Sequence, residues 1–404
     1  MSLNSTPSAD RIHIGIFGRR NAGKSSLINA ITGQNLAIVS DTKGTTTDPV
    51  LKAMELLPLG PVVLIDTPGL DDEGDLGQLR IEKAYQILNK TDIALLVIDS
   101  SVGMTRDDEA ILKKIQEKEI PYLIVYNKSD ISSPDIASNE SSISVSTFSG
   151  EHIPELKERI ASLTPTSGES LPIVRDLLHP YDFVVLVVPI DSSAPKGRLI
   201  LPQQQTIRDI LEAQAVSIVV KDTELEETLE NLGKIPALVI TDSQAFKEVS
   251  NIVPKQIPLT SFSILFARHK GDLDIVASGA YSIENLKDGN TVLISEGCTH
   301  HRQCEDIGTV KIPRLLKKYT QVDLNFEFTS GTEFPDDLSK YSLIIHCGGC
   351  TLNEREMKYR LRCATDQHIP ITNYGIAIAH MNGILKRSLE PFTEKQSKFP
   401  PSAG

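Results

Sequence analysis

The sequence predicts an α/β fold of three domains, at residues 1–165, 172–261 and 262–404. Short apolar runs alternate with amphipathic stretches along most of the 404 residues, which is the pattern of strands covered by helices. A chain of this length exceeds one ordinary hydrophobic core. The five cysteines all lie in the last third, so the chemistry of the third domain is expected to differ from that of the others.

The first domain is predicted to contain a parallel sheet with helices on both faces. Its strands are expected at Ile12–Phe17, Val62–Ile65, Ala94–Ile98 and Tyr122–Tyr126, and its helices at Ser25–Thr32 and Asp107–Glu117. The segment that follows, Leu163–Leu171, is rich in Ser, Thr, Pro and Gly. Such a composition is typical of a linker.

The second and third domains continue the pattern. Residues 172–261 are interpreted as a small dimerisation or spacer domain, with strands at Phe183–Pro189, Ser217–Val220 and Ala237–Ile240 and helices at Gln203–Ala213 and Glu224–Leu232. In the third domain, strands at Thr291–Ser295 and Ser342–His346 each run toward a cysteine. Ligand sites of parallel sheets collect at the carboxyl ends of strands. The polar tail after Arg387 is expected to be loosely held.

Composition excludes several classes of function. No apolar run reaches the roughly 18 residues of a membrane span, and the polar N-terminus lacks a signal pattern, so a cytoplasmic protein without a membrane partner is expected. The formal net charge is −12, whereas residues 260–404 carry 17 basic and 17 acidic side chains. Since neither the residues before 260 nor residues 260–404 have a basic excess, a nucleic-acid partner is not expected.

The strongest motif is Gly18-Arg19-Arg20-Asn21-Ala22-Gly23-Lys24-Ser25, which matches G-x-x-x-x-G-K-S between a predicted strand and a predicted helix. Backbone N–H groups of such a loop, with the helix N-terminus, hold phosphate oxygens. Lys24 is expected to reach the β- and γ-phosphates and Ser25 to bind Mg²⁺. The adjacent Ser26 is also expected to bind the nucleotide.

Two further motifs each follow a predicted strand. In Asp66-Thr67-Pro68-Gly69, Asp66 is expected to hold Mg²⁺ through a water and Gly69 N–H to meet the γ-phosphate. In Asn127-Lys128-Ser129-Asp130, the Asp130 carboxylate can accept two hydrogen bonds from guanine, whereas adenine lacks that pair of donors. Together the three motifs predict a GTPase that binds GTP and GDP.

In order and context these motifs resemble the translation-factor-like GTPases, especially the tRNA-modification and ribosome-assembly branch. The resemblance implies that Ser146 touches the guanine carbonyl. It also implies that Thr46, in the Gly44–Asp48 stretch, completes the Mg²⁺ shell. Leu70 follows Gly69 where Ras-like enzymes have the glutamine that orients water, so intrinsic hydrolysis is expected to be slow.

Asn21 carries a separate hypothesis. In a related subgroup of GTPases, an asparagine at this position of the loop helps bind K⁺, which supplies the positive charge of an arginine finger. The resemblance therefore implies K⁺-stimulated hydrolysis, with Lys24, Asn21 and Thr46 as the catalytic residues. The alternative is that Asn21 only shapes the loop.

The cysteines are Cys298, Cys304, Cys347, Cys350 and Cys363. An odd number, clustered late in a chain expected in the cytosol, argues against a disulfide framework. Three of them lie in C-x-H and H-C-x-x-C motifs. The spacing alone is compatible with an iron–sulfur cluster, a structural zinc site or a thioredoxin-like redox pair.

A GTPase domain of the K⁺ type followed by C-x-H and H-C-x-x-C resembles the HydF family of [FeFe]-hydrogenase maturation GTPases. The resemblance covers the whole chain in domain order. It implies a [4Fe–4S] cluster on Cys298, Cys347 and Cys350 with a labile fourth position. It further implies a homodimeric scaffold and carrier, which takes a diiron precursor from two radical-SAM maturases to the apo-[FeFe]-hydrogenase.

Two questions stay open at the level of sequence. The fourth cluster ligand is expected among Asp306, His300 and His346, although either histidine could equally be a supporting or core residue. The alternative function is a ribosome- or tRNA-associated GTPase with a zinc-stabilised C-terminal domain. The neutral charge of that domain argues against it, because RNA-binding surfaces are basic.

Overall fold

The computed structural model describes the chain in two compact units, Met1–Gly168 and Glu169–Gly404. The described residues are 11–33, 50–57, 59–69, 84–132, 140–163, 171–189, 199–297, 306–331, 333–335, 337–349 and 352–396. The segment 164–170, within the predicted linker, lies outside them. Among the described residues, no helix combines the length and the apolar character that a membrane span requires.

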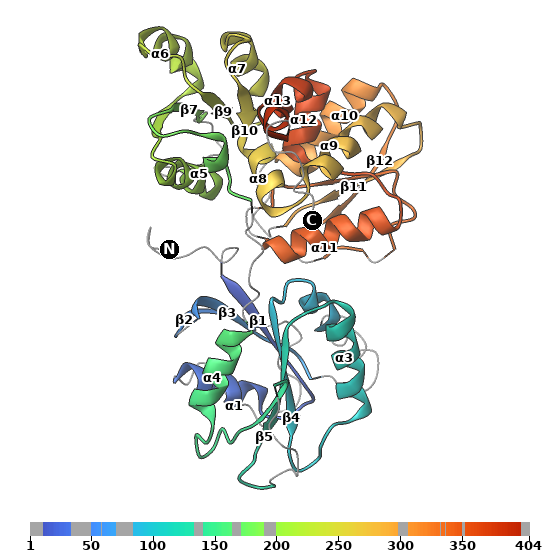
Figure 1. The fold of residues 1–404 in the computed structure, drawn as a ribbon. Helices are drawn as coiled ribbons and strands as arrows, with labels where there is room; N and C mark the ends of the chain where they lie inside the picture. The colour runs from blue at the N-terminus through green and yellow to red at the C-terminus, as the bar shows by residue number, and fades with distance from the viewer. Residues whose placement is uncertain are drawn as a thin grey trace. The chain divides into compact units, whose positions relative to one another are not determined.

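The first unit is a six-stranded sheet with helices on both faces (Figure 1). The strand order is β2-β3-β1-β4-β5-β6, in which only β2 and β3 pair antiparallel. The elements are β1 (Ile12–Phe17), α1 (Lys24–Thr32), β2 (Val50–Leu56), β3 (Gly60–Asp66), β4 (Ile93–Asp99), α3 (Arg106–Glu117), β5 (Tyr122–Asn127), β6 (Ser142–Ser144) and α4 (Ile153–Ser162). Every element predicted for this unit is confirmed to within two residues at each end, and β2, β6 and α4 are additional.

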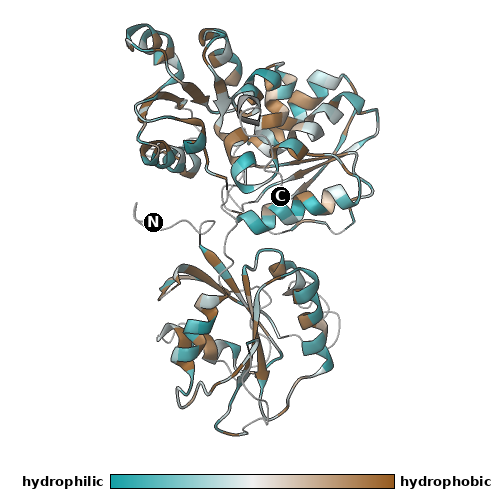
Figure 2. Cartoon of the chain, viewed as in Figure 1, coloured by the Kyte–Doolittle hydropathy of each residue, from teal (hydrophilic) through white to brown (hydrophobic). Residues whose placement is uncertain are grey.

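The burial of the central strands on both faces explains why the sequence alone predicts them. In β4, Leu95 and Val97 face the cluster that includes α1 and α4, while Leu96 and Ile98 face the cluster that includes α3. Both faces are therefore apolar, and Figure 2 shows the strands in brown between helices of mixed colour. Full burial of one such side chain stabilises the fold by about 1.5–3 kcal/mol.

The second unit contains two four-stranded parallel sheets, ordered β10-β9-β7-β8 and β12-β11-β13-β14. The strands are β7 (Phe183–Val187), β8 (Val216–Val220), β9 (Leu238–Thr241), β10 (Leu259–Ser261), β11 (Thr291–Ser295), β12 (Asn325–Thr329), β13 (Leu343–His346) and β14 (Ile371–Asn373). The helices are α5 (Leu201–Glu212), α6 (Leu225–Asn231), α7 (Phe246–Ile252), α8 (Phe262–Lys270), α9 (Leu273–Tyr281), α10 (Ile312–Thr320), α11 (Glu354–Asp366), α12 (Tyr374–Met381) and α13 (Leu385–Gln396), with shorter turns at η2 (Arg175–Leu177), η3 (Asp222–Glu224), η4 (Ser282–Asn285) and η5 (Ile307–Lys311).

The two sheets of the second unit share one hydrophobic core. Val185 and Val239 of the first sheet belong to the same buried cluster as Leu293 and Ile344 of the second. Helices α8 and α9 contribute to that cluster from the chain segment that joins the two sheets. The segment therefore packs between the two sheets.

The prediction of a loosely held tail after Arg387 is wrong for the residues up to Gln396. These residues continue helix α13, which contains Pro391. Leu385 is buried, and Leu389 and Phe392 pack against the shared core. An apolar stripe at this helical spacing stabilises the segment by tertiary packing, which outweighs the backbone hydrogen bond that proline removes.

A buried arginine of α11 connects this helix to the second sheet of the unit. Arg360 is fully buried, and its guanidinium donates to Glu356 Oε1 at 3.0 Å, to Ser295 Oγ at 3.0 Å and to Gly331 O at 2.7 Å. It also lies 5.2 Å from the ring centre of Phe334. One side chain thus connects α11, the end of β11 and the loop that follows β12.

Replacing Arg360 by Met is expected to lower the free energy of unfolding of the second unit by about 3–5 kcal/mol, because the buried Glu356 carboxylate then lacks its partner. Calorimetry of the full chain would measure the change as a lower transition temperature for this unit. Arg362→Met is the control, since it removes the same charge from an exposed position of the same helix. Equal effects of the two substitutions would contradict this account of Arg360.

Candidate functional site

The loop between β1 and α1 has a backbone that two glycines make possible. Gly18 and Gly23 have φ angles of 141° and 94°. A Cβ would lie 2.2 Å from Val97 O at the first and 2.1 Å from Asn127 Nδ2 at the second, so no larger residue fits. Asn21 has a φ of 60°, a left-handed conformation that asparagine adopts more readily than most residues. Packing against β4 and β5 therefore fixes the shape of the loop.

Lys24 and Ser25 open α1 and converge with Asp66 at the end of β3. The Lys24 side chain is buried, and its Nζ donates to Gly18 O and Arg19 O at 2.8 Å each. Ser25 Oγ donates to Asp66 Oδ2 at 2.9 Å. Burial raises the pKa of Asp66, and the Ser25 hydrogen bond partly opposes that rise. Two of the three residues predicted for Mg²⁺, Ser25 and Asp66, therefore lie together, beside the Lys24 ammonium predicted for phosphate.

Some of the other residues predicted to lie near the phosphates are described by the structure, and others are not. A Cβ at Gly69 would lie 3.0 Å from Arg20 N, so the second motif approaches the loop closely. Ser26 lies in the first turn of α1 and is half-buried. Thr46 and Leu70 lie outside the described residues.

The residues predicted to bind the base form a hydrogen-bonded group beside this loop. Asn127 is buried; its Nδ2 donates to Ala22 O at 3.0 Å, and its Oδ1 accepts from Thr147 N at 3.2 Å. Ser146 Oγ donates to Asp130 Oδ1 at 2.5 Å. The amide of Asn127 therefore joins the phosphate loop to the loop predicted to touch guanine, and Ser146 orients the carboxylate that would select the base.

Lys128 completes this arrangement. It has a φ of 68°, and its Nζ pairs with the Asp99 carboxylate at 2.5 Å. Because Asp99 is the last residue of β4, the ion pair fixes the third motif to the neighbouring strand. The described residues of the three motifs thus gather at the carboxyl ends of β1, β3 and β5, where an α/β sheet binds ligands. Their chemistry fits a guanine nucleotide with Mg²⁺.

The second candidate site lies at the carboxyl ends of β11 and β13. These strands are parallel neighbours, so their side chains alternate together between the two faces of the sheet. Leu293 and Ile344 face the shared core on the side of α11. Ile294 and Ile345 face the opposite cluster, which includes residues of α10 and α12. The alternation assigns each residue beyond the strands to one face.

Cys347 follows β13 on the face covered by α10 and α12. Its Sγ accepts a hydrogen bond from Gly297 N at 2.9 Å, and its own N–H donates to Ser295 O at 2.9 Å. An N–H donor to sulfur favours the thiolate, which is the form that binds metals. The backbone at the end of β11 thus holds the sulfur in place.

Two residues beside Cys347 had not been predicted. The Tyr374 hydroxyl, at the start of α12, donates to Glu296 Oε1 at 3.3 Å. Burial and the negative charges of Cys347, Glu296 and Asp306 raise the pKa of Tyr374, so its hydroxyl stays protonated. Glu296 directly follows a strand that the sequence predicted and was therefore detectable. Tyr374 carried no local signal, because the strand before it is only three residues long.

The structure separates two of the predicted fourth ligands. Asp306 caps η5: its Oδ2 accepts from Thr309 N at 2.8 Å and from Thr309 Oγ1 at 2.9 Å. It lies near enough to Tyr374 to influence its pKa. His346 instead ends β13 on the α11 face, and burial lowers its pKa to about 4. The neutral imidazole is thus on the other side of the sheet from the Cys347 sulfur.

Of the three cysteines predicted to hold a cluster, only Cys347 lies among the described residues. Gly349 has a φ of 63°, and a Cβ there would lie 2.6 Å from Met357 Sδ. The turn that leads to Cys350 therefore packs closely on α11. Cys298, His300 and Cys350 lie outside the described residues, as does Cys304. Within the described part of the chain, no three Cys, His, Asp or Glu residues are grouped closely enough to hold a metal.

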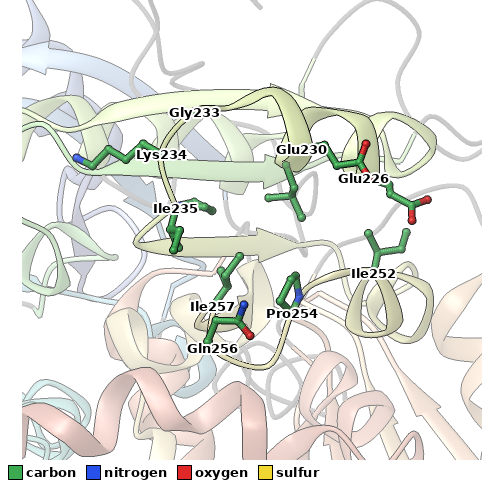
Figure 3. A pocket seen from close by; sticks show the side chains of 11 residues that line it. Glu226, Glu230, Gly233, Lys234, Ile235, Ile252, Pro254, Gln256 and Ile257 are labelled. Atoms are coloured by element: carbon green, nitrogen blue, oxygen red, sulfur yellow. The ribbon is translucent and has the colours of Figure 1, made fainter.

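A pocket of about 450 Å³ lies in the second unit at the amino ends of β9 and β10 (Figure 3). None of the residues predicted from the sequence for a site lines it. Its walls are mainly apolar, with two carboxylates on α6, and they include Glu226, Leu229, Glu230, Ile235, Ile252 and Ile257.

Comparison with known proteins gives three matching family models, in the order of the predicted domains. Residues 13–128 match the 50S ribosome-binding GTPase model. Residues 173–271 match the hydrogen maturase F dimerization domain. Residues 274–391 match the hydrogen maturase F tetramerization domain.

Individual relatives share mainly the first unit. The tRNA modification GTPase MnmE of Nitrosomonas europaea is 38% identical over 162 residues, which are 39% of this chain and 35% of that protein. GTPase Der of Wolinella succinogenes is 33% identical over 186 residues, which are 42% of this chain and 39% of that protein. The chain thus spans little more than a third of the length of these relatives. Among solved structures, a point variant of Aquifex aeolicus Era bound to GDP.AlF4⁻ has 21% identity and a TM-score of 0.35, covering 52% of this chain and 92% of that one.

The two hydrogen maturase models adjoin each other and together cover more than half of the chain. They follow a GTPase domain, so the expected family and α/β fold class are both confirmed. The chain belongs to the hydrogen maturase F family.

Proposed function

We propose that the protein hydrolyses GTP in its first unit and holds a [4Fe–4S] cluster in its second, as the scaffold that delivers a diiron precursor to apo-[FeFe]-hydrogenase. Two radical-SAM maturases would supply that precursor. The observation that carries the proposal is the position of Cys347, at the carboxyl end of β13 with its sulfur bonded to Gly297 N. This is where two chain segments that contain cysteine motifs approach each other.

The nucleotide site supports slow, K⁺-stimulated hydrolysis. Lys24 would neutralise the phosphates, while Ser25, Thr46 and Asp66 would position Mg²⁺. The backbone of Asn21 has a left-handed conformation. Its side-chain carboxamide would serve as a K⁺ ligand. A cation there supplies positive charge to the phosphoryl group in the transition state.

In the second unit, Cys298, Cys347 and Cys350 would hold the cluster. When bound, the cluster supplies an iron with one exchangeable ligand, at which cargo can attach. The matched family models favour this reading over a ribosome- or tRNA-associated protein with a zinc module, because two of the three belong to a hydrogen maturase. The nucleotide state would control the exchange of partners.

Oligomerisation is part of the proposed scaffold, since the matched domains are named for dimerization and tetramerization. We propose that a homodimer forms at β8, which is an edge strand of its sheet among the described residues. Val216 and Val219 of β8 are 40% and 44% exposed. An apolar edge strand offers unpaired N–H and C=O groups to a second copy.

Anaerobic reconstitution with iron and sulfide tests the cluster. We expect about four irons and four sulfides per chain, as in a [4Fe–4S] centre, and loss of most of the iron in Cys347→Ser. Cys363→Ser is the control, because Cys363 packs against the shared core. Chains that take up zinc but no iron would instead support the zinc-stabilised alternative.

GTP turnover in KCl is expected to exceed turnover in NaCl by about tenfold or more, because one preorganised charge in a phosphoryl-transfer site has at least this effect. Asn21→Gly should abolish the difference, since glycine keeps the left-handed backbone but has no carboxamide. GDP affinity serves as the control for loop integrity. Equal rates of the wild type in both salts would refute the K⁺ hypothesis.

Replacing Val216 and Val219 by Lys is expected to reduce dimerisation, because charged side chains oppose pairing between strand edges. Light scattering during size-exclusion chromatography would show a smaller assembly. Ile235→Lys adds the same charge at another exposed apolar position and should leave the assembly unchanged. A double variant with the mass of the wild type would exclude β8 as the interface.

A further inference from the structure

The pocket at the amino ends of β9 and β10 has largely apolar walls, which come from two helices and two loops (Figure 3). Leu229 of α6 and Ile252 of α7 are half-buried, and Ile257 is buried. Ile235, in the loop before β9, is 69% exposed. The volume of about 450 Å³ lies within the range of about 300–1,000 Å³ that is usual for ligand pockets. A pocket of this kind, with an exposed apolar residue at its rim, is typical of a binding surface.

One wall of the pocket is fixed by the helix α13. Arg387 of this helix donates hydrogen bonds to the carbonyls of Pro254 and Ile257, at 2.8 and 3.4 Å, and both of these residues line the pocket. Leu229 and Ile252 pack against the shared core of the second unit. The pocket is therefore preformed, so a partner that binds there loses little free energy to the ordering of its walls.

The charge at the pocket is negative. Glu226 and Glu230 lie four residues apart in α6, on one face of the helix, and both are exposed. Neither carboxylate forms an ion pair with another residue that the structure describes. Lys234 also lines the pocket, but its Nζ donates to Tyr181 O at 2.9 Å and lies 5.2 Å from the ring centre of Phe183. Figure 3 shows this side chain pointing away from the two carboxylates. Because like charges on adjacent turns repel, a cation that binds between them is favoured.

We propose that this pocket docks a partner protein through an exposed segment in which an arginine stands beside a bulky apolar side chain. The guanidinium pairs with Glu226 and Glu230, and the apolar side chain fills the space between Ile235 and Ile257. Arginine fits best, because its planar guanidinium can bond two carboxylates and can also lie along an apolar surface. The same carboxylates disfavour nucleic acids and anionic membranes, whose phosphates they repel. The inference rests on the proposed function, which names the partners as the two radical-SAM maturases and the apo-hydrogenase.

Biolayer interferometry of the full-length protein against each of these three purified partners tests the pocket. Glu230→Lys is expected to weaken binding of the partner that docks there by about tenfold or more, because it sets like charges against each other in the interface. It should also reduce the dependence of that affinity on salt. Glu227→Lys is the matched control, since Glu227 is exposed on the same helix but does not line the pocket. An equal loss in both variants, or wild-type affinity of Glu230→Lys for all three partners, would overturn the proposal.

Photocrosslinking identifies the segment that occupies the pocket. With p-benzoylphenylalanine in place of Ile235, mass spectrometry of the crosslinked peptides is expected to show a partner segment that contains an arginine next to an apolar residue. A crosslink to a second copy of this chain, or to a segment without a basic residue, would contradict the inference.

The same binding measurements separate this inference from the function on which it rests. A wild type that binds none of the three partners would remove the proposed carrier function, and this inference with it. A wild type that binds them, together with a Glu230→Lys variant that binds them equally well, would reject the pocket alone.

Discussion

Parallel pairing of strands is the constraint on which both candidate sites depend. A parallel sheet brings the carboxyl ends of its strands to one edge. In the first unit this edge gathers the loop after β1, Asp66 at the end of β3 and the base motif that begins at the end of β5. In the second it brings Gly297 and Cys347 together, although 50 residues separate them in the chain. Neither site would form if one strand reversed its direction.

Much of the fold could be predicted because the central strands are apolar on both faces. β1, β4 and β11 are of this kind, and the glycine-rich motif marks the first helix. The missed strands were short or exposed. β14 has three residues, and β12 has no fully buried residue, so neither leaves a continuous apolar run. The helical C-terminal segment was missed because Pro391 and its polar residues hid the stripe of Leu385, Leu389 and Phe392.

The candidate sites were predictable to the extent that their residues lie in sequence motifs. The three nucleotide motifs have fixed local spacing, so Lys24, Ser25 and Asp130 could be assigned roles directly. The surroundings of Cys347 depend on tertiary packing. Tyr374 reaches Glu296 from a helix 78 residues further along the chain, and no local pattern specifies such a contact. Strand alternation alone places the consecutive residues His346 and Cys347 on opposite faces, but only the packed helices show which face each residue takes.

The shared core of the second unit has a consequence for how assembly and cargo chemistry relate. Arg387 of α13 donates to the carbonyls of Ser250, Val253 and Pro254, at 2.9, 2.9 and 2.8 Å. Helix α13 is thereby anchored to α7 and to the loop between α7 and β10. The regions that match a dimerization and a tetramerization domain are therefore one cooperative folding block. Removing either region would expose apolar surface of the other. A change in subunit contacts at one sheet would therefore be transmitted to the carboxyl ends of β11 and β13 through the shared core, without a hinge.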